Sequence, residues 1–179
     1  MNLDDQDILS LFFTKGKEQI AFGHLAKKYQ ERVYWHIRKM VINHEDANDV
    51  TQNTFIKIWK GLPNFKQDSN LFTWMYRIAT NESLNFIKSN KKRVAQSIDE
   101  LQIENKSEES LFTGDEIEAK LYKAIGTLPN KQKAVFNLKY FEELKYTEIA
   151  ELLGGTVGSL KASYHHAQKK IEAFLINKD

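Results

Sequence analysis

The chain contains no cysteine among its 179 residues, and only two prolines and eight glycines. The lack of cysteine excludes disulfide bonds and thiolate metal sites, and it is compatible with a reducing compartment. No apolar run reaches the roughly eighteen residues that a membrane-spanning helix needs. The N-terminus is acidic rather than basic, unlike a secretory signal. We therefore expect a soluble, cytoplasmic protein without membrane insertion.

The composition is 41% hydrophobic and 28% charged, which supplies enough apolar material for folded cores. The net charge of +2 conceals three blocks of different sign. Residues 1–96 carry a net +5, residues 97–118 a net −7, and residues 119–179 a net +4. Phosphate binding depends on local charge, so two basic bodies flanking an acidic connector matter more than the near-neutral total.

Between the few helix breakers, apolar residues recur at helical rather than alternating spacing, which predicts an all-α fold. A short helix is expected around residues 5–14 and a long one over 18–41. A third over 45–62 ends at Pro63, because proline has no N–H and its ring clashes with the preceding turn. Helical periodicity resumes at Leu71 and continues to a basic end at residues 91–93.

From Ala95 to about Ser110 the sequence is acidic and has no clear period, which predicts a flexible linker. A capping-box pattern at residues 113–116 predicts that helical order resumes there. The expected organisation is two small helical domains, residues 1–94 and 113–179, joined by a flexible acidic linker over 95–112.

The second domain ends in a pattern typical of a helix-turn-helix. Thr147 can cap a short helix, Gly154 and Gly155 can form a tight turn, and Thr156 can cap a final helix to about residue 174.

Three stretches, taken in order, resemble one known family. They are DANDVTQNTFIKIWKGLPNF at residues 46–65, LFTWMYRIATNESLNFIK at residues 71–88, and LPNKQKAVFNLKYFEELKYTEIAELLG at residues 128–154. Together they resemble the extracytoplasmic function (ECF) group of sigma-70 family sigma factors. Unrelated helix-turn-helix proteins would share only the third stretch, so the joint match is the specific signal.

The resemblance implies a non-enzymatic subunit that binds core RNA polymerase and directs promoter-specific transcription initiation. The N-terminal domain would read minus-ten DNA and the C-terminal helix-turn-helix minus-thirty-five DNA. An anti-sigma factor is an expected further partner. No phosphate-cradling glycine loop, metal-ligand cluster or cysteine nucleophile occurs, so we predict no enzymatic activity, no cofactor and no metal site. The acidic linker either follows the polymerase's basic RNA path or is a solvated spacer.

By the resemblance, the helix over 45–62 would bind polymerase. Its candidate residues are Asp46, Asp49, Gln52, Phe55 and Trp59. Two alternatives stay open: the aspartates can serve only to stabilise the helix N-terminus, and the two aromatic residues can belong to the core.

A reader of opened minus-ten DNA needs cations for phosphate, amides for base edges and rings for stacking. Phe72, Trp74 and Tyr76 supply rings, although Trp74 can equally belong to the core. The candidate cations and amides are Lys66, Asn70, Arg77, Asn81, Asn85, Lys88, Lys91, Lys92 and Arg93. The family usually has aspartate and arginine where this chain has Asn85 and Lys88.

The last helix would enter the major groove of the minus-thirty-five element. Its candidate contacts are Thr156, Ser159, Lys161, Ser163, His166 and Lys169, opposite an apolar side that includes Leu160, Tyr164, Ala167 and Ile171. The family commonly has arginine in place of Ser163 and His166, and a threonine-valine pair in place of Ser159-Leu160.

One alternative from another functional class is a conventional helix-turn-helix regulator, which binds duplex DNA without polymerase. It differs from the sigma-factor hypothesis in predicting tight duplex binding by the protein alone.

Overall fold

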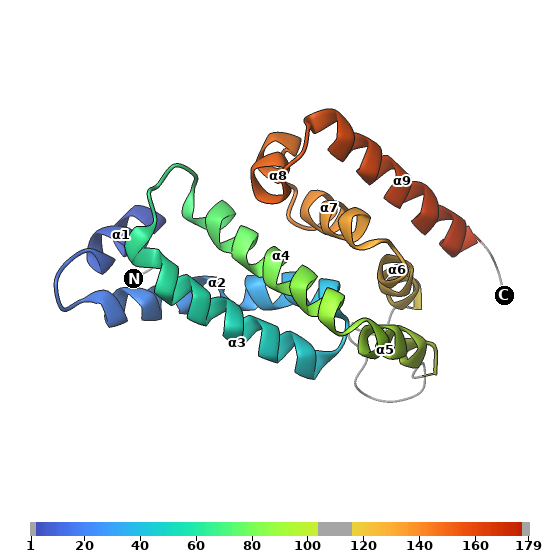
Figure 1. Ribbon diagram of the computed structural model, residues 1–179, viewed down its shortest axis with the longest axis horizontal. Helices are drawn as coiled ribbons and strands as arrows, with labels where there is room; N and C mark the ends of the chain where they lie inside the picture. Colours follow the sequence, from blue (N-terminus) through green and yellow to red (C-terminus); the bar gives the residue numbers. More distant parts are fainter. Residues whose placement is uncertain (1–2, 104–115, 177–179) are drawn as a thin grey trace.

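The computed structural model describes residues 3–103 and 116–176, and within these ranges every regular element is helical (Figure 1). This confirms the all-α prediction. The elements are α1 (Asp5–Phe12), α2 (Glu18–Val41), α3 (His44–Gly61), the 3-10 helix η1 (Leu62–Asn64), α4 (Leu71–Ser89), α5 (Lys91–Ile103), α6 (Glu116–Gly126), α7 (Asn130–Tyr140), α8 (Tyr146–Leu153) and α9 (Val157–Ile176).

Side-chain caps define where three of the N-terminal helices begin. Asp4, Asn43 and Asn70 each accept a hydrogen bond from the backbone N–H three positions later, at 2.8, 3.1 and 2.7 Å. Each bond satisfies an N–H group that has no partner within its helix. Because Asn70 caps α4, its amide oxygen is engaged in positioning the helix.

Helix α2 forms the centre of the N-terminal body, and α1, α3 and α4 pack against it. Leu25, Val33 and Ile37 recur on its buried side and are inaccessible to solvent. Ile58 of α3 and Met75 of α4 meet this side and are also fully buried. The predicted stripe on residues 18–41 is therefore the core of this body.

A neutral histidine is built into this core. His36 of α2 is 1% exposed, and its Nε2 lies 2.8 Å from Thr80 Oγ1 on α4. Its ring also packs on Tyr76, with 4.9 Å between ring centroids. Burial, assisted by nearby Lys39, lowers the pKa of His36 from 6.5 to about 3.

We expect this histidine to make the fold acid-sensitive. Its folded pKa is depressed, so the unfolded chain takes up a proton below pH 6.5 that the native state refuses until about pH 3. Stability should therefore fall by up to ~1.4 kcal/mol per pH unit across that window. Urea unfolding between about pH 7 and 5 measures this loss.

The control for this experiment is the exposed His24. His36→Gln should remove much of the pH dependence, whereas His24→Gln should retain it. Equal pH dependence in the two variants would contradict a buried, neutral His36.

The C-terminal body packs α6 and α7 against α9. Its core joins Ile125, Phe136, Ala167 and Ile171, all buried. Phe136 also stacks on Tyr164, with centroids 5.6 Å apart. The apolar side predicted for the last helix is therefore its packed side.

The predicted helix-turn-helix is present as α8 and α9. Gly154 and Gly155 join them with φ angles of 74° and 90°, in the left-handed region that favours glycine. Thr156 caps α9 as predicted, since its Oγ1 accepts the Ser159 N–H at 3.1 Å. The expected cap at Thr147 was wrong, because Lys145 is the N-cap of α8.

The N-terminal boundary of the linker needs correction, because α5 is helical through residue 103. Val94 is 4% exposed, and Ile98 lies one turn later and faces Gly126 of α6. This short i, i+4 apolar pair favours a packed helix, and the acidic composition concealed it. The rest of the predicted linker, 104–112, and the capping-box residues 113–115 lie outside the described residues.

The two bodies contact each other along α2 and α4. Helix α8 lies against α4, and α6 and α7 lie against the C-terminal part of α2 (Figure 1). Val135, Leu138 and Ile149 are fully buried and share one apolar cluster with the core of the N-terminal body. The structure is therefore a closed arrangement of two helical bodies.

Candidate functional site

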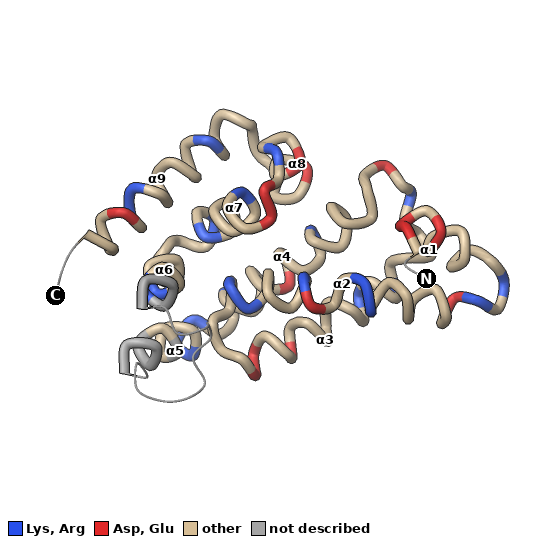
Figure 2. The backbone as a smooth tube through the Cα atoms, turned by 180° about the vertical axis from the view of Figure 1, so that it is seen from behind, with Lys and Arg blue, Asp and Glu red and all other residues tan. Residues whose placement is uncertain are grey.

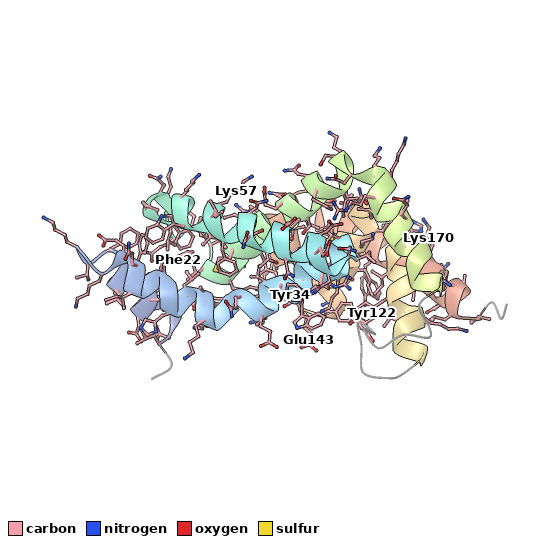
Figure 3. The ribbon with its side chains drawn as sticks, turned by 90° about the horizontal axis from the view of Figure 1, so that it is seen from below. Phe22, Tyr34, Lys57, Tyr122, Glu143 and Lys170 are labelled. Atoms are coloured by element: carbon pink, nitrogen blue, oxygen red, sulfur yellow. The ribbon has the colours of Figure 1, made fainter. Side chains whose placement is uncertain are left out.

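A groove of about 770 Å³ runs between α2 and α3. Phe22, labelled in Figure 3, forms part of its wall. Its ring lies edge-on to Trp59 and Phe55, with centroid distances of 5.1 and 6.3 Å. The residues around the groove are Phe22, Ala26, Gln30, Asn48, Thr51, Gln52, Phe55, Ile56 and Trp59. An apolar floor with amide groups among its lining suits a helical protein partner.

Three of the predicted polymerase contacts line this groove: Gln52, Phe55 and Trp59. Trp59 keeps 36% of its surface exposed, so it is available for contact. Ile56 is 48% exposed in the same groove and was missed. Its place four residues after Gln52 on the same helix face could have identified it. Asp49 is exposed on α3 but does not line the groove.

Asp46 does not line the groove, and its side chain is only 1% exposed. Its Oδ1 is 2.7 Å from Arg93 Nη2, so the pair joins α3 to the start of α5. Burial raises the pKa of Asp46, and the Arg93 charge opposes that rise. The pair removes Asp46 from the candidate polymerase surface and gives Arg93 a structural role.

We expect Arg93→Ala to lower the free energy of unfolding by ~1–3 kcal/mol, because it removes the ion-pair partner of a buried carboxylate and leaves only the weaker interaction with Arg38. Lys92→Ala, an exposed neighbour, should stay within about 0.5 kcal/mol of the parent chain. Chemical denaturation of both variants measures the difference. Similar stability of the two variants would show that the ion pair contributes little.

The candidate minus-ten residues on α4 form one row. Arg77, Asn81, Asn85 and Lys88 follow helical spacing, and all except the half-buried Arg77 are exposed. Of the others, Lys66 is exposed in the loop before α4, and Lys91 and Lys92 are exposed at the start of α5; Asn70 caps α4 and Arg93 pairs with Asp46.

The rings of α4 divide between two environments. Trp74 is half-buried and packs on Phe65 at 5.0 Å between centroids, which supports its alternative role in the core. Phe72 packs on Tyr76 at 4.1 Å, on the side of α4 that faces α2. Trp74 shares the helix face of Asn81 and Asn85 but is half-buried, whereas Phe72 and Tyr76 lie on the opposite side of α4.

A second pocket, of about 330 Å³, lies between α1 and the loop before α4. Asp5 and Gln6 of α1 line it together with loop residues 67–70. Asp5 is fixed there, since it accepts hydrogen bonds of 2.7 Å from both Lys28 and the Tyr29 hydroxyl. Sequence reasoning missed this contribution of α1 because the partners of Asp5 lie more than twenty residues later.

The candidate minus-thirty-five residues lie on the exposed side of α9. Lys161 is exposed in the second turn of α9, and His166 and Lys169 are exposed farther along the helix. Figure 2 shows blue Lys and Arg segments at more than one place along α9. Thr156 and Ser159 are also exposed, whereas Ser163 is half-buried and donates its hydroxyl to the Ser159 carbonyl at 2.9 Å. This hydrogen bond leaves the Ser163 oxygen available as an acceptor.

Comparison with known proteins separates the chain into the same two bodies. The family model described as Sigma-70 region 2 matches residues 25–93, and that described as Sigma-70, region 4 matches residues 118–171. The RNA polymerase sigma-H factor of Pseudomonas aeruginosa is 32% identical over 166 residues, covering 87% of this chain and 86% of that protein. The chain belongs to the ECF group of sigma-70 family sigma factors.

Other relatives agree with this membership. The ECF RNA polymerase sigma-E factor of Escherichia coli is 29% identical over 166 residues, with 87% of this chain and 86% of that protein covered. CnrH, solved with the cytosolic domain of CnrY, has a TM-score of 0.69 at 21% identity, with 96% of both chains covered. The sigma factor RpoE, solved with the anti-sigma factor NepR from Bartonella quintana, has a TM-score of 0.68 at 21% identity and covers 88% of this chain and 98% of its own.

As a sigma factor, the protein directs promoter-specific transcription initiation through its region 2 and region 4 domains, with core RNA polymerase and promoter DNA as partners. Sigma factors are non-catalytic, which confirms the prediction that the chain is not an enzyme. Among the described residues, no helix is long and apolar enough to cross a membrane. The same part of the chain holds no group of three or more residues suited to a metal ion.

Proposed function

We propose that the N-terminal body of this sigma factor binds core polymerase through the groove between α2 and α3 and reads minus-ten DNA with α4. The observation that carries this proposal is the separation of two surfaces on one body. Gln52, Phe55 and Trp59 line the groove, whereas Asn81 and Asn85 are exposed on a different helix. One body can therefore hold polymerase and a DNA strand simultaneously.

In this proposal, the loop before α4 supplies Lys66, and the start of α5 supplies Lys91 and Lys92. These exposed cations lie beyond the two ends of the amide row. Cations contribute affinity for the phosphate backbone, and amides contribute hydrogen bonds to base edges. We omit Arg93 from the DNA contacts because it pairs with Asp46.

The C-terminal body reads minus-thirty-five DNA by placing α9 in the major groove. Ser159 and Lys161 lie in the first turns, where a recognition helix approaches base edges. His166 and Lys169 lie farther along and suit phosphate contacts. Two small DNA-binding bodies on one chain bind a promoter more tightly than either body alone. Once one body is bound, the effective concentration of the other at its own DNA element is higher.

Run-off transcription on fragmented genomic DNA tests this proposal. Core polymerase with this protein should give new RNA starts that share two spaced upstream motifs, and neither protein alone should give them. Failure to bind core polymerase, together with tight duplex binding by the protein alone, would instead favour a conventional regulator.

Two single substitutions then test the two DNA-binding bodies separately. Asn85→Ala should weaken use of the motif near the start site, and Lys161→Ala should weaken use of the upstream motif. Mapping starts on promoters that carry one altered motif at a time makes this distinction.

Two further assignments rest on relatives. RpoE was solved with an anti-sigma factor, and we propose a comparable protein inhibitor for this chain. Family membership also supports a cytoplasmic location. Pull-down from the source cells, followed by disruption of transcription in the run-off assay, tests the inhibitor.

A further inference from the structure

The loop between α7 and α8, residues 141–145, inserts an acidic side chain between helices of the other body. Glu142 Oε2 lies 3.1 Å from Arg32 Nη2 of α2 and accepts a 3.2 Å hydrogen bond from the Tyr76 hydroxyl of α4. The Glu142 side chain is only 8% exposed. A single carboxylate therefore joins the C-terminal body to two helices of the N-terminal body.

Glu142 reaches a cation that already lies on an aromatic surface. The Arg32 guanidinium is 4.7 Å from the centroid of the Phe72 ring, and Phe72 packs on Tyr76 at 4.1 Å between centroids. Tyr76 is fully buried in the closed arrangement. Burial, and then the Glu142 charge, raises the pKa of Tyr76, so its hydroxyl remains a proton donor at neutral pH.

This cluster has the chemistry of a site for single-stranded nucleic acid. Arginine binds phosphate and carboxylate oxygens in the same way, and strand-binding surfaces combine cations with aromatic side chains on which bases stack. Phe72 and Tyr76 lie on α4, which also presents the exposed Asn81 and Asn85. By helical spacing the two rings lie on the face of α4 away from these amides, so the Arg32 cluster is a second strand contact on the same helix and not a continuation of the amide row.

Neighbouring contacts hold the same loop and helix in place. Lys39 Nζ lies 3.9 Å from the centroid of the Phe141 ring, and Asn137 Nδ2 donates to the Lys39 carbonyl at 3.4 Å. Leu144 at the end of the loop is buried in the apolar cluster that the two bodies share. These contacts position the loop, and the Lys39 charge also interacts with the Glu142 carboxylate.

We propose that Glu142 is an internal stand-in for a DNA phosphate: it holds the free protein closed by occupying a single-strand site formed by Arg32, Phe72 and Tyr76. The inference rests on the proposed minus-ten role of α4. Opening of the two bodies releases Glu142 and uncovers the site, so closure and strand binding exclude one another.

The chain offers a matched control for this carboxylate. Glu143 is the next residue, is exposed, and lies at the edge of the molecule in Figure 3. Its φ of 54° turns the loop there. Glu142→Gln and Glu143→Gln change the net charge equally, so any difference between them reports the buried contact.

The first measurement is the distance between the bodies. The chain has no cysteine, so Lys60→Cys on α3 and Glu172→Cys on α9 introduce the only two thiols for a donor and an acceptor dye. Glu142→Gln should lower energy transfer, and Glu143→Gln should leave it unchanged. Equal transfer in the two variants would overturn the proposed latch.

The second measurement is binding of a fluorescent single-stranded dT oligomer of about twelve nucleotides to the unlabelled full chain. Glu142→Gln should bind at least about fivefold more tightly than Glu143→Gln, because a charge-assisted contact no longer competes with the strand. Adding Arg32→Gln to Glu142→Gln should abolish this gain. Adding Lys27→Gln, which removes an exposed charge from the same helix, should preserve most of it.

Opening without tighter strand binding, or equal losses from Arg32→Gln and Lys27→Gln, would overturn the strand site. Run-off transcription by the parent chain keeps this result separate from the proposed function. Normal promoter use with no effect of Glu142→Gln on opening or binding would reject only the latch. Altered opening and strand binding without promoter-dependent transcription would reject the proposed function.

Discussion

Ile56→Glu should reduce the affinity for core RNA polymerase by at least about tenfold while leaving the fold intact. Ile56 is 48% exposed and lines the groove with Phe55 and Trp59. A carboxylate placed there loses its hydration when a partner covers an apolar groove, and a change at a hot-spot residue of an interface costs about 2 kcal/mol or more. The free protein does not incur this cost, because the side chain is already partly in water.

The matched control is Ile20→Glu. Ile20 is 58% exposed on α2 and does not line the groove. The affinity of Ile20→Glu for core polymerase should stay within about threefold of that of the parent chain. Fluorescence anisotropy of the labelled sigma factor with core polymerase gives both affinities, and thermal unfolding verifies that both variants fold. Parent-like binding by Ile56→Glu would place the polymerase contact elsewhere on region 2.

The helices themselves could be predicted from the sequence because their signals are local. Helix α2 begins and ends at the expected residues, since its stripe of Leu25, Val33 and Ile37 continues over more than three turns. The turn at Gly154 and the cap at Thr156 were also predictable, because each depends on the chemistry of one residue. Helix α5 was missed over 95–103, although Val94, Ile98 and Leu101 follow helical spacing, because the acidic composition of this stretch was given more weight.

The parts of the site that were not predicted depend on contacts between distant residues. Asp46 and Arg93 look like solvent-exposed charges in their own helices, and only the tertiary fold brings them within 2.7 Å of each other. Glu142 has no local feature that separates it from Glu143, yet one is buried against Arg32 and the other is exposed. Local periodicity predicts which helix face is apolar, but it does not predict which body covers that face.

Lys133 presents the opposite problem, a charged side chain buried without a partner. It lies on α7, is 2% exposed, and pairs with no carboxylate among the described residues. Burial lowers its pKa from 10.5 to about 8. Because this folded pKa still lies above neutral pH, the native state retains a costly buried charge at pH 7.

Lys133→Met should therefore stabilise the protein by up to ~3 kcal/mol at neutral pH, since the pKa difference corresponds to about 1.4 kcal/mol per unit. Methionine retains most of the length and apolar stem of lysine. Lys131→Met, an exposed position on the same helix, should change stability by no more than about 0.5 kcal/mol. Urea denaturation of the parent protein, Lys133→Met and Lys131→Met measures these differences in the free energy of unfolding.

The pH dependence of stability tests whether the buried Lys133 ammonium causes this difference. Between the folded pKa of about 8 and the unfolded value of 10.5, the unfolded chain binds more protons, so the parent should gain stability as pH rises. Lys133→Met should lack the part of this gain that comes from Lys133, whereas Lys39, whose pKa burial also lowers, retains its own. The comparison ends at about pH 9.5, because Tyr29 and Tyr76 are buried and have raised pKa values in the folded protein. At higher pH these tyrosines lose their protons more readily in the unfolded chain, which favours unfolding. A destabilised Lys133→Met with unchanged pH dependence would show that the ammonium makes a favourable contact that outweighs its burial.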